Sequence, residues 1–542
     1  MILKESNLLV IKKLNLSISG NSILNNISFK LKKNEILGFV GESGSGKSIT
    51  AFSIINLFNS KKIKKSGHVF FNGKRIDSLK NKDFEKIRGS EISIIFQEPM
   101  NSLNPSMKCG RQVLEIILKH TVLTNLKAKK RVLDLFKMVK LNSPETVYNK
   151  YPHELSGGQQ QRIMIGIAIA CNPKILIADE PTTSLDGIVK KEIIDLLKGI
   201  QKQTQMGIIF VSHDLSLVSK IANNIIILKR GSIVEFGDSK QIFKSPKNKY
   251  TRMLLNARPP KKGRPKRLPS SDNGLEKHPL ISKKERAEKH KKIYKSDPIL
   301  KVKNLHFAYE KKMILNNIHF NIYKGETLGL IGESGSGKST IAKSILNLNN
   351  FQKGEILFNN INIKKYNKKD FRKNIQLIFQ DPFSSLNPQS SVGFSIMEPM
   401  IAHKLYKNKD ARVSKVYQLL ENVGLKKNDF LKYPSQFSGG QRQRIVIARA
   451  LALSPKIIIC DESVSALDVS VQAQVLNLLN SLKEKFSFTF LFISHDLSVI
   501  RYMSDRVIVL NNGTIEENGE TDKVFNSPIM PYTKQLLSAS NY

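Results

Sequence analysis

The chain of 542 residues contains no tryptophan and only three cysteines, Cys109, Cys171 and Cys460. The cysteines form no C-x-x-C pair and no even-numbered set, so we expect reduced thiols and neither zinc nor iron–sulfur ligation. No apolar run approaches the roughly 18–20 residues that cross a bilayer. The N-terminal residues MILKESNLLVIKK contain two charges, Lys4 and Glu5, before a signal-peptide core can form. The sequence therefore predicts a chain that is soluble, or held at a membrane by a partner.

Acidic residues are also scarce, 45 against 87 lysines and arginines, for a formal net charge of +42. This balance is typical of proteins that bind nucleic acids or anionic lipids. The lysines, however, are spread along both halves beside Asn and Ile, which favours a compositional origin, and we expect no nucleic-acid partner. One local excess covers residues 258–296, with 14 basic and 4 acidic residues. Its Pro and Gly residues predict an exposed linker.

The sequence repeats itself. The octapeptide GESGSGKS begins at Gly41 and again at Gly332, 291 positions later. Further pairs follow in the same order: IIFQEPMNSLNP and LIFQDPFSSLNP, LSGGQQQRI and FSGGQRQRI, ILIADE and IIICDE, FVSHDLSLV and FISHDLSVI. These later pairs are 282 or 283 positions apart, so few insertions separate the copies. We predict two domains, 1–257 and 297–542, joined by the linker 258–296.

Each copy contains a P-loop, which follows an apolar strand and precedes a helix that we expect to begin at Ser48 in the first copy. Glycines let the backbone approach phosphates, and the N–H groups at the helix start can cradle an anion. Lys47 and Lys338 are predicted to reach the β- and γ-phosphates, and the hydroxyls of Ser48 and Ser339 to hold Mg²⁺. The nucleotide-binding residues expected in the two loops are Gly41, Glu42, Ser43, Gly44, Ser45, Gly46, Lys47, Ser48 and Ile49, and Gly332, Glu333, Ser334, Gly335, Ser336, Gly337, Lys338, Ser339 and Thr340.

Two carboxylates follow a short apolar run in each copy. The run is typical of a strand buried on both faces of a parallel sheet, and open α/β sheets bind ligands where such strands end. We predict that Asp179 and Asp461 hold Mg²⁺ and that Glu180 and Glu462 orient and deprotonate the attacking water. The SHD segments invite a Ser-His-Asp triad, but adjacent residues at a strand end point in different directions. The catalytic histidines expected to contact a γ-phosphate instead are His213 and His495.

The order of P-loop, FQ loop, SGGQ, DE and SHD resembles the nucleotide-binding domain of ABC ATPases, twice over nearly the whole chain. The resemblance implies an α/β fold of two tandem P-loop ABC ATPase domains. Each would have a RecA-like α/β core, an antiparallel β subdomain and a helical subdomain, the last over residues 100–155 and 383–436. It also implies ATP and Mg²⁺ as cofactors and ATP hydrolysis as the activity.

The SGGQ segments are the most specific part of the resemblance. Each starts a helix whose N-terminal dipole can face a γ-phosphate. In the family that phosphate belongs to the ATP of the other domain, so each site would combine the P-loop, glutamate and histidine of one copy with the SGGQ segment of the other. The segments implied are Ser438, Gly439, Gly440 and Gln441 for site one, and Ser156, Gly157, Gly158 and Gln159 for site two.

The FQ(E/D)P…SLNP loops and the YT(R/K)xLL tails resemble the dipeptide/oligopeptide importer branch. The fused layout resembles the double ATPase subunits of microcin C-type and glutathione-type peptide importers. By resemblance, Gln97 and Gln380 contact Mg²⁺ or water on one side and the membrane subunit on the other. The partners implied are two membrane permease subunits and a separate solute-binding protein, and the location implied is the cytoplasmic face of the inner membrane.

The copies depart from the family pattern in places. Tyr309 lies where the family stacks an aromatic ring on adenine, whereas the matched residue in copy one is Ile18. We therefore expect unequal nucleotide affinity. After Asp186, copy one has Gly187 and two lysines in place of small and β-branched residues, and copy two reads DESVSALD where many relatives have Pro and Thr. A cysteine-rich tail is missing, so no iron–sulfur cluster is expected, and no catalytic residue is lost.

Other functions stay open at this point. A tandem ABC protein acting on ribosomes also has two domains and a basic linker, but its linker is typically a longer helical hairpin, and it lacks the SLNP and YTxxLL elements. A DNA-repair ABC ATPase needs zinc-binding cysteine clusters. Within transport, import of nickel or another small solute is the main alternative, because these motifs do not read the cargo.

Overall fold

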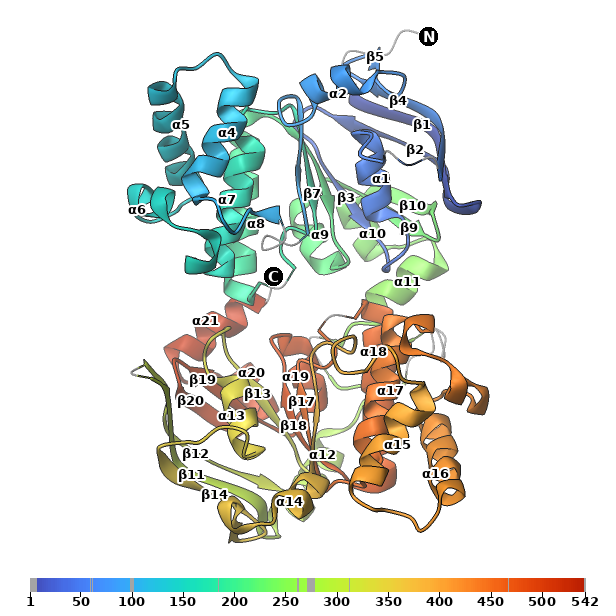
Figure 1. The fold of residues 1–542 in the computed structure, drawn as a ribbon, viewed down its shortest axis with the longest axis vertical. Helices are drawn as coiled ribbons and strands as arrows, with labels where there is room; N and C mark the ends of the chain where they lie inside the picture. Colours follow the sequence, from blue (N-terminus) through green and yellow to red (C-terminus); the bar gives the residue numbers. More distant parts are fainter. Residues whose placement is uncertain are drawn as a thin grey trace. The chain divides into compact units, whose positions relative to one another are not determined.

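The computed structural model describes residues 7–58, 60, 62–97, 102–183, 185–260, 263–270, 278–310, 312–465 and 467–540. The chain divides into two units, Met1–Leu255 and Asn256–Asn541. Both are α/β units with one antiparallel and one larger, mostly parallel sheet (Figure 1).

Unit one contains an antiparallel sheet in the order β2-β1-β4-β5 and a six-stranded sheet in the order β10-β9-β3-β8-β7-β6. The antiparallel strands are β1 (Asn7–Ile18), β2 (Asn21–Lys32), β4 (Ile63–Phe71) and β5 (Lys74–Arg75). The strands of the larger sheet are β3 (Ile36–Val40), β6 (Ile92–Ile95), β7 (Ile175–Asp179), β8 (Gly207–Val211), β9 (Asn224–Lys229) and β10 (Ser232–Asp238). Neighbours in it run parallel, except that β9 and β10 are antiparallel.

The centre of the larger sheet is fully buried. All five residues of β3, β7 and β8 are buried, which is why these strands read as unbroken apolar runs rather than as alternating patterns. The predicted strand ILIAD is confirmed as β7, between β6 and β8. Its carboxyl end therefore lies beside that of β8 and at the same edge of the sheet as that of β3, where the SHD segment and the P-loop begin.

Helices cover the sheets of unit one and form a separate group beyond β6. They are α1 (Lys47–Ile54), α2 (Asn81–Ile87), α4 (Cys109–His120), α5 (Asn125–Met138), α6 (Pro144–Asn149), α7 (Gly157–Ile169), α8 (Gly187–Thr204), α9 (Leu215–Ile221), α10 (Ser239–Lys244) and α11 (Lys249–Asn256). The group α4–α6, which packs on α7, is the predicted helical subdomain. Residues 98–101 of the FQEPMNSLNP loop lie outside the described residues.

Unit two repeats this topology. Its sheets have the orders β12-β11-β14-β15 and β16-β17-β18-β13-β19-β20. The strands are β11 (Pro298–Tyr309), β12 (Lys312–Tyr323), β13 (Thr327–Ile331), β14 (Lys353–Phe358), β15 (Ile361–Asn362), β16 (Ile375–Ile378), β17 (Ile457–Asp461), β18 (Thr489–Ile493), β19 (Arg506–Asn511) and β20 (Thr514–Glu520). The helices are α12 (Lys283–Tyr294), α13 (Lys338–Ile345), α14 (Lys368–Asn374), α15 (Val392–Ala402), α16 (Lys409–Asn422), α17 (Gly439–Leu451), α18 (Val469–Phe486), α19 (Leu497–Met503), α20 (Thr521–Asn526) and α21 (Pro531–Ser540).

The prediction of an exposed linker over 258–296 is wrong for the residues that the structure describes there; residues 261–262 and 271–277 lie outside them. Leu268 is fully buried in a core cluster of unit two, and Arg264 and Arg286 are each 7% exposed. Residues 283–294 form α12, whose N-terminus is capped by Ser282. The segment therefore packs on unit two, while the domain boundaries at 257 and 297 stay a prediction.

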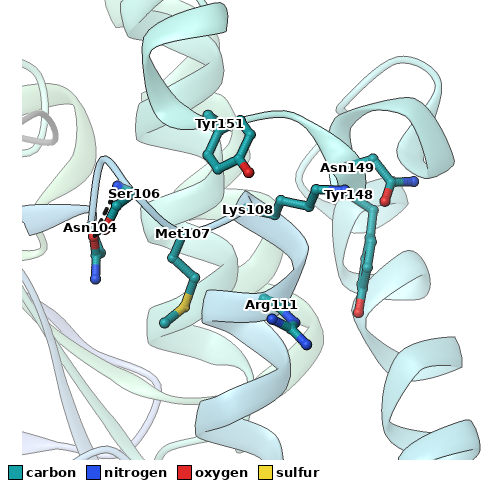
Figure 2. A pocket seen from close by; sticks show the side chains of 8 residues that line it. All are labelled: Asn104, Ser106, Met107, Lys108, Arg111, Tyr148, Asn149 and Tyr151. Carbon is teal, nitrogen blue, oxygen red and sulfur yellow. Dashed lines mark hydrogen bonds between the residues drawn. The ribbon is translucent and has the colours of Figure 1, made fainter.

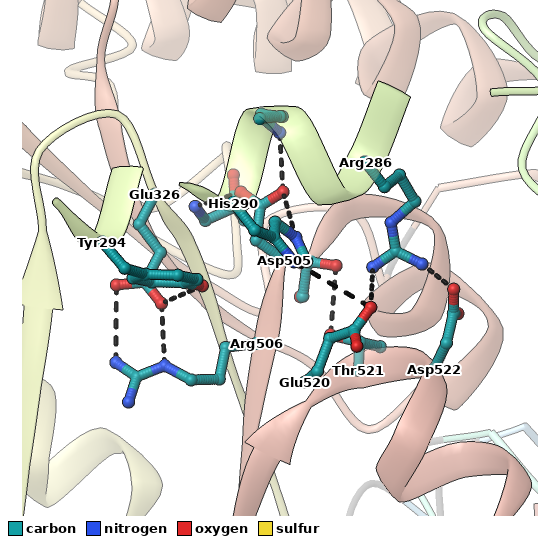
Figure 3. Close-up of polar contacts among 12 residues, drawn as sticks. Arg286, His290, Tyr294, Glu326, Asp505, Arg506, Glu520, Thr521 and Asp522 are labelled. Atoms are coloured by element: carbon teal, nitrogen blue, oxygen red, sulfur yellow. Dashed lines mark hydrogen bonds and ion pairs between the residues drawn. The ribbon is translucent and has the colours of Figure 1, made fainter. Parts of the chain in front are cut away.

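Charged residues hold this segment in place (Figure 3). Arg286 pairs with Asp522 and, at 3.4 Å, with Glu520. Lys289 lies 2.6 Å from Asp505, a carboxylate whose side chain is 4% exposed. Burial alone would raise the pKa of Asp505, but Lys483, His290 and Lys289 around it hold that pKa well below its usual range. The exposed-linker prediction failed because these acidic partners lie more than 200 residues further along the chain.

Candidate functional site

The P-loop of each unit turns at a glycine that no other residue can replace without strain. Gly46 precedes α1 with φ 101°, and Gly337 precedes α13 with φ 104°. A Cβ at Gly46 would lie 2.7 Å from a methyl of Leu24. Neither helix has a side-chain cap, so its first N–H groups face the loop as an anion site requires. The helix α1 begins at Lys47, one residue before the predicted start.

The P-loop lysines point into their own loops. Nζ of Lys47 donates to the carbonyl oxygens of Gly41 at 2.8 Å and Glu42 at 3.0 Å, and Lys338 repeats the arrangement in unit two. The hydroxyl of Ser45, buried in the same loop, has no hydrogen-bond partner in the structure. A cationic side chain and an orphaned hydroxyl inside a ring of backbone N–H groups fit a phosphate.

The predicted magnesium ligands meet in both units. Ser48 Oγ donates to Asp179 Oδ1 at 3.0 Å, and Ser339 Oγ donates to Asp461 Oδ1 at 3.2 Å. Burial raises the pKa of Asp179 to about 6 and also raises that of Asp461. Within the described part of the chain no group of three or more His, Cys, Asp or Glu side chains is placed to hold a metal ion. One carboxylate with one hydroxyl nevertheless suits Mg²⁺, which usually completes its octahedron with water and substrate phosphates.

The glutamate after each of these aspartates contacts the other side chains predicted for the site. Glu180 Oε2 accepts hydrogen bonds from Gln97 Nε2 at 3.1 Å and from Thr183 Oγ1 at 2.9 Å, and it lies 3.1 Å from His213 Nδ1. Burial raises the pKa of Glu180, but the hydrogen bond and charge of His213, followed by Lys47, outweigh burial and lower that pKa overall. The side chain is therefore a buried carboxylate that stays ionised at neutral pH.

Unit two repeats the cluster with one change. Gln380 Nε2 lies 3.1 Å and His495 Nδ1 3.2 Å from Glu462 Oε2. Ser465, which takes the place of Thr183, donates to the backbone carbonyl of Glu462 instead of its carboxylate. Both glutamates have a left-handed backbone, φ 48° and 50°, which is unfavourable for a residue with a side chain. The left-handed conformation thus recurs at the matched position of both copies.

The SGGQ segments form helix starts, as predicted. Ser156 caps α7 and Ser438 caps α17, each in a capping box with the glutamine three residues later. Ser438, Gly440 and Gln441 line a pocket of about 530 Å³ together with Gly424, Leu425, Arg444, Val471 and Gln474. This lining includes no residue of the P-loop of unit two. The segment is thus presented on its own surface, separate from the phosphate site of the same unit.

The position expected to stack on adenine has a different environment in the two units. Tyr309 ends β11, is 50% exposed and packs edge-on against Phe307. Ile18 ends β1 at the matched place and packs against the core of its unit.

One contact was missed by the sequence reasoning. The hydroxyl of Tyr250, in α11, donates to Glu42 Oε2 at 3.1 Å, and the N–H of Glu42 lies 3.4 Å from the same hydroxyl. In unit two the N–H of Glu333 donates to the hydroxyl of Tyr532, in α21, at 3.3 Å. The only signal in the sequence was the recurrence of the YT(R/K)xLL tail.

A second pocket, of about 450 Å³, lies between α4 and α6 in unit one (Figure 2). Its lining contains two cations, Lys108 and Arg111, and no carboxylate; the other lining residues are Asn104, Ser106, Met107, Tyr148, Asn149 and Tyr151. At the matched surface of unit two, Phe394 is 46% and Leu431 77% exposed. The two cations of unit one are therefore replaced by Ser391 and Phe394 at the matched positions of unit two.

Comparison with protein families gives two matches. The model described as "ABC transporter" matches residues 24–183 and 315–465. The model described as "Oligopeptide/dipeptide transporter, C-terminal region" matches residues 234–279 and 516–541. The first model matches once in each unit, and the second matches once at the end of unit two and once across the boundary between the units.

Curated relatives match over almost the full length. The glutathione import ATP-binding protein GsiA of Shigella dysenteriae serotype 1 and that of Escherichia coli strain K12 are each 40% identical to this chain over 571 residues, covering 99% of it and 90% of the relative. Among solved structures, CbiO1 from Clostridium perfringens, part of the ABC transporter complex CbiONQ, is 28% identical and covers 43% of this chain and 92% of its own, with a TM-score of 0.40. No helix among the described residues is long and apolar enough to cross a membrane.

Proposed function

The chain belongs to the ABC transporter family, and from that premise we propose that it is the ATP-hydrolysing subunit of an importer for peptides or peptide-like solutes, with glutathione the first cargo to test. The oligopeptide/dipeptide model matches the chain twice, which favours a peptide over nickel. The observation that carries the ATPase proposal is the complete cluster of P-loop lysine, Ser–Asp pair and Gln–Glu–His group in each unit.

The residues of each cluster have separate tasks in hydrolysis. The N–H groups at the start of α1 and the ammonium of Lys47 bind and orient the β- and γ-phosphates. Glu180, held ionised, accepts a proton from the attacking water and aligns it with phosphorus. Gln97 and His213 contact that carboxylate, and the task proposed for His213 is to donate to the γ-phosphate. Lys338, Glu462, Gln380 and His495 take the same roles in unit two.

Magnesium fits the Ser–Asp pairs, and when bound it supplies positive charge that offsets the charge developing on the transferred phosphoryl group. We propose that Ser48, Asp179 and Gln97 hold it in unit one. The matched ligands in unit two are Ser339, Asp461 and Gln380.

We further propose that each ATP is completed by the SGGQ segment of the opposite unit. The support is that Ser438 and Gly440 line a surface pocket without their own P-loop, and that the side chain of Ser438 takes the N–H of Gln441 but not those of Gly439 and Gly440 at the helix start. A chain that carries both halves keeps the two parts at high effective concentration.

The partners proposed are two membrane permease subunits, supplied with cargo by a separate solute-binding protein, and the place is the cytoplasmic face of the inner membrane. The basic pocket of unit one and the apolar matched surface of unit two, near Phe394 and Leu431, are the proposed permease contacts. Because these surfaces differ in chemistry, we expect the two permease subunits to differ.

The test of the ATPase proposal is the double variant Glu180→Gln and Glu462→Gln. Loss of the general base should lower the ATPase rate about 10²–10⁴-fold, while ATP binding persists because the phosphate contacts are intact. The rate is measured on the purified full-length chain with Mg²⁺, with the parent chain as control. A double variant that hydrolyses ATP at the parent rate would show that these carboxylates are not the bases.

A further inference from the structure

The outer end of the helix pair α4 and α5 exposes an unusual number of large apolar side chains. We call residues 118–131, the end of α4, the connecting loop and the start of α5, the 118–131 tip (Figure 1). Val122 is 104% exposed and Leu126 83%, and Leu118 and Leu123 are each 37% exposed. Single exposed apolar residues are ordinary, but a group of them on one projecting turn marks an interaction surface.

The same tip is strongly basic. Lys119, Lys127, Lys129 and Lys130 are all exposed, and no Asp or Glu lies between Glu115 and Asp134. Lysines surround the apolar side chains along the sequence on both sides of the loop. An apolar turn ringed by cations complements an anionic lipid surface, in which headgroup phosphates lie above hydrocarbon.

The matched tip of unit two is also basic, with Lys404, Lys407 and Lys409 exposed, but it exposes less apolar surface. Between α15 and α16 only Ile401 and Tyr406 are exposed large apolar residues, at 42% and 38%, and Leu405 packs against the core. Asp410 adds an acidic residue in the first turn of α16. The helical subdomain therefore folds with a less apolar tip, so the strongly exposed Val122 and Leu126 of unit one are not a requirement of the fold.

We propose that the 118–131 tip of unit one contacts the surface of an anionic bilayer, with Val122 and Leu126 entering the interface and the lysines at the headgroups. The two most exposed side chains, Val122 and Leu126, lie in the loop and in the first turn of α5, which suits a fluid interface; a protein partner would have to provide a matching groove. This contact is additional to the proposed permease contacts and needs neither ATP nor cargo.

The absence of tryptophan makes a clean test possible. Leu126→Trp places a single indole at the tip of the full-length chain, and Tyr406→Trp places one at the matched tip of unit two as control. Each variant is mixed with vesicles of phosphatidylglycerol and phosphatidylcholine, or phosphatidylcholine alone, with and without brominated acyl chains. We expect the Leu126→Trp emission to shift to shorter wavelength and to be quenched by brominated lipid in the anionic vesicles, and the Tyr406→Trp emission to be unaffected.

Reversing charges at the tip distinguishes insertion of the tip from the general electrostatic attraction between an anionic vesicle and a chain of net charge +42. Lys127→Glu with Lys130→Glu in the Leu126→Trp chain should weaken vesicle binding at least about tenfold and abolish quenching. Vesicle binding without quenching of the indole at 126, or equal quenching at 406, would overturn the proposal. An emission shift seen only with membranes that contain the permease would assign the tip to a protein partner instead. All of these outcomes leave the ATPase proposal standing.

A different observation carries a second inference, which rests on the proposed nucleotide site. The tyrosine of each C-terminal tail contacts the second residue of its own P-loop, across 208 positions in unit one and 199 in unit two. Tyr250 is 5% exposed, with Lys229 Nζ 4.5 Å from its ring centroid. The carbonyl of that same P-loop residue, Glu42, accepts from Lys47. The tail thus reaches the catalytic lysine through one intervening residue.

We propose that Tyr250 and Tyr532 are positioning residues that hold each P-loop in the conformation that receives phosphate. Both lie in the region matched by the oligopeptide/dipeptide C-terminal model. The proposed role depends on the hydroxyl group. A phenylalanine ring would fill the same space but could not form the hydrogen bond to the loop.

Tyr250→Phe is tested in a Lys338→Ala background, which leaves unit one as the nucleotide site. Binding of a fluorescent ATP analogue should weaken about fivefold with unchanged thermal stability. Tyr502→Phe removes another buried hydroxyl, 3.4 Å from Asn477, and should leave binding at the background level. Glu42→Ala should show no further loss when combined with Tyr250→Phe. Unchanged binding in Tyr250→Phe, or equal loss in Tyr502→Phe, would overturn the role, whereas a background chain that binds no analogue would count against the nucleotide site itself.

Discussion

Asp505→Asn tests whether the charged cluster around α12 holds the segment 264–294 on unit two. Asn is the residue at the matched position of unit one, Asn223, where its side chain accepts a hydrogen bond from the N–H of Ile36. In unit two Asp505 accepts from the N–H of Thr327 at 2.9 Å and pairs with Lys289 and with Lys483, the latter at 3.2 Å. The substitution keeps the size and the backbone contact and removes the charge.

The expected loss of stability follows from the charge on Lys483, which remains after Asp505 is neutralised. Lys483 has a side chain that is 12% exposed, and without Asp505 it is a buried cation without its nearest counter-charge. Breaking such a pair by removing one partner costs about 3–5 kcal/mol. We expect the lower end, about 3 kcal/mol, because Lys289 reaches solvent and the asparagine can still accept from Thr327.

The loss should depend on pH in a defined direction. Burial lowers the pKa of Lys483 to about 8, against the opposing effect of Asp505. Without Asp505 this folded-state pKa falls further below the unfolded value, so the lysine of the variant loses its proton at a lower pH than the lysine of the parent. Once the pH rises past about 8 the parent lysine also loses its proton, and the stability gap narrows. Asp505, whose pKa is depressed, contributes stability at pH values above its unfolded pKa and loses that contribution only as the pH falls through the folded pKa.

The assay is urea unfolding of the full chain at pH 7 and pH 9, with hydrogen exchange of the α12 amides as the local readout. Lys483→Gln introduces the residue found at the matched position of unit one. Together with the double variant it completes a double-mutant cycle, in which the double variant should lose less stability than the two single variants added together. A change below about 0.5 kcal/mol at pH 7, which is typical of an unremarkable surface substitution, or a gap that widens from pH 7 to pH 9, would refute the reasoning.

Three further outcomes are expected. Glu180→Gln with Glu462→Gln should abolish ATP hydrolysis and retain ATP, as measured by turnover and by bound nucleotide after gel filtration. Tyr309→Ala should weaken ATP binding more than Ile18→Ala, because a stacked ring contributes about 1–3 kcal/mol in comparable base-stacking settings and an isoleucine offers only burial; equal effects in equilibrium binding would mean that another aromatic ring serves site one. Lys108→Ser with Arg111→Phe, the residues found at the matched positions of unit two, should reduce recovery of one permease subunit with the affinity-purified chain and leave ATPase activity unchanged; equal loss of both subunits, or of neither, would contradict a distinct basic contact.

The repeat made most of the catalytic cluster predictable. A motif such as ILIADE predicts a buried strand that ends in two acidic side chains. Parallel strands bring their C-terminal ends to one edge of the sheet. The sequence alone therefore predicts that Ser48 and Asp179 lie close together, although they are 131 positions apart. The left-handed backbone of Glu180 and Glu462 was not foreseeable, because it is imposed by the packing around the strand end and not by a local glycine signal.

The segment 258–296 was misread for a similar reason. Its charge and its Pro and Gly residues are typical of a solvated chain, whereas its partners, Asp505, Glu520 and Asp522, are remote in sequence. One local signal was present, since Ser282 and Glu285 form a capping box, which predicts the start of a helix at α12. The contact of Tyr250 with Glu42 had no such signal beyond the recurrence of the tail.

The central claim is that ATP hydrolysis by this chain drives import of peptides, and uptake in cells tests it most directly. Cells that lack the chain are complemented with the parent or with the Glu180→Gln, Glu462→Gln variant at equal protein level, and the uptake of radiolabelled glutathione, a labelled tripeptide and nickel is measured. We predict that peptide uptake by the transporter is restored only by the parent and that nickel uptake is the same in all strains. Peptide uptake that is unaffected by loss of the chain, with nickel uptake lost or with the chain recovered on ribosomes in a salt-sensitive manner, would contradict the account.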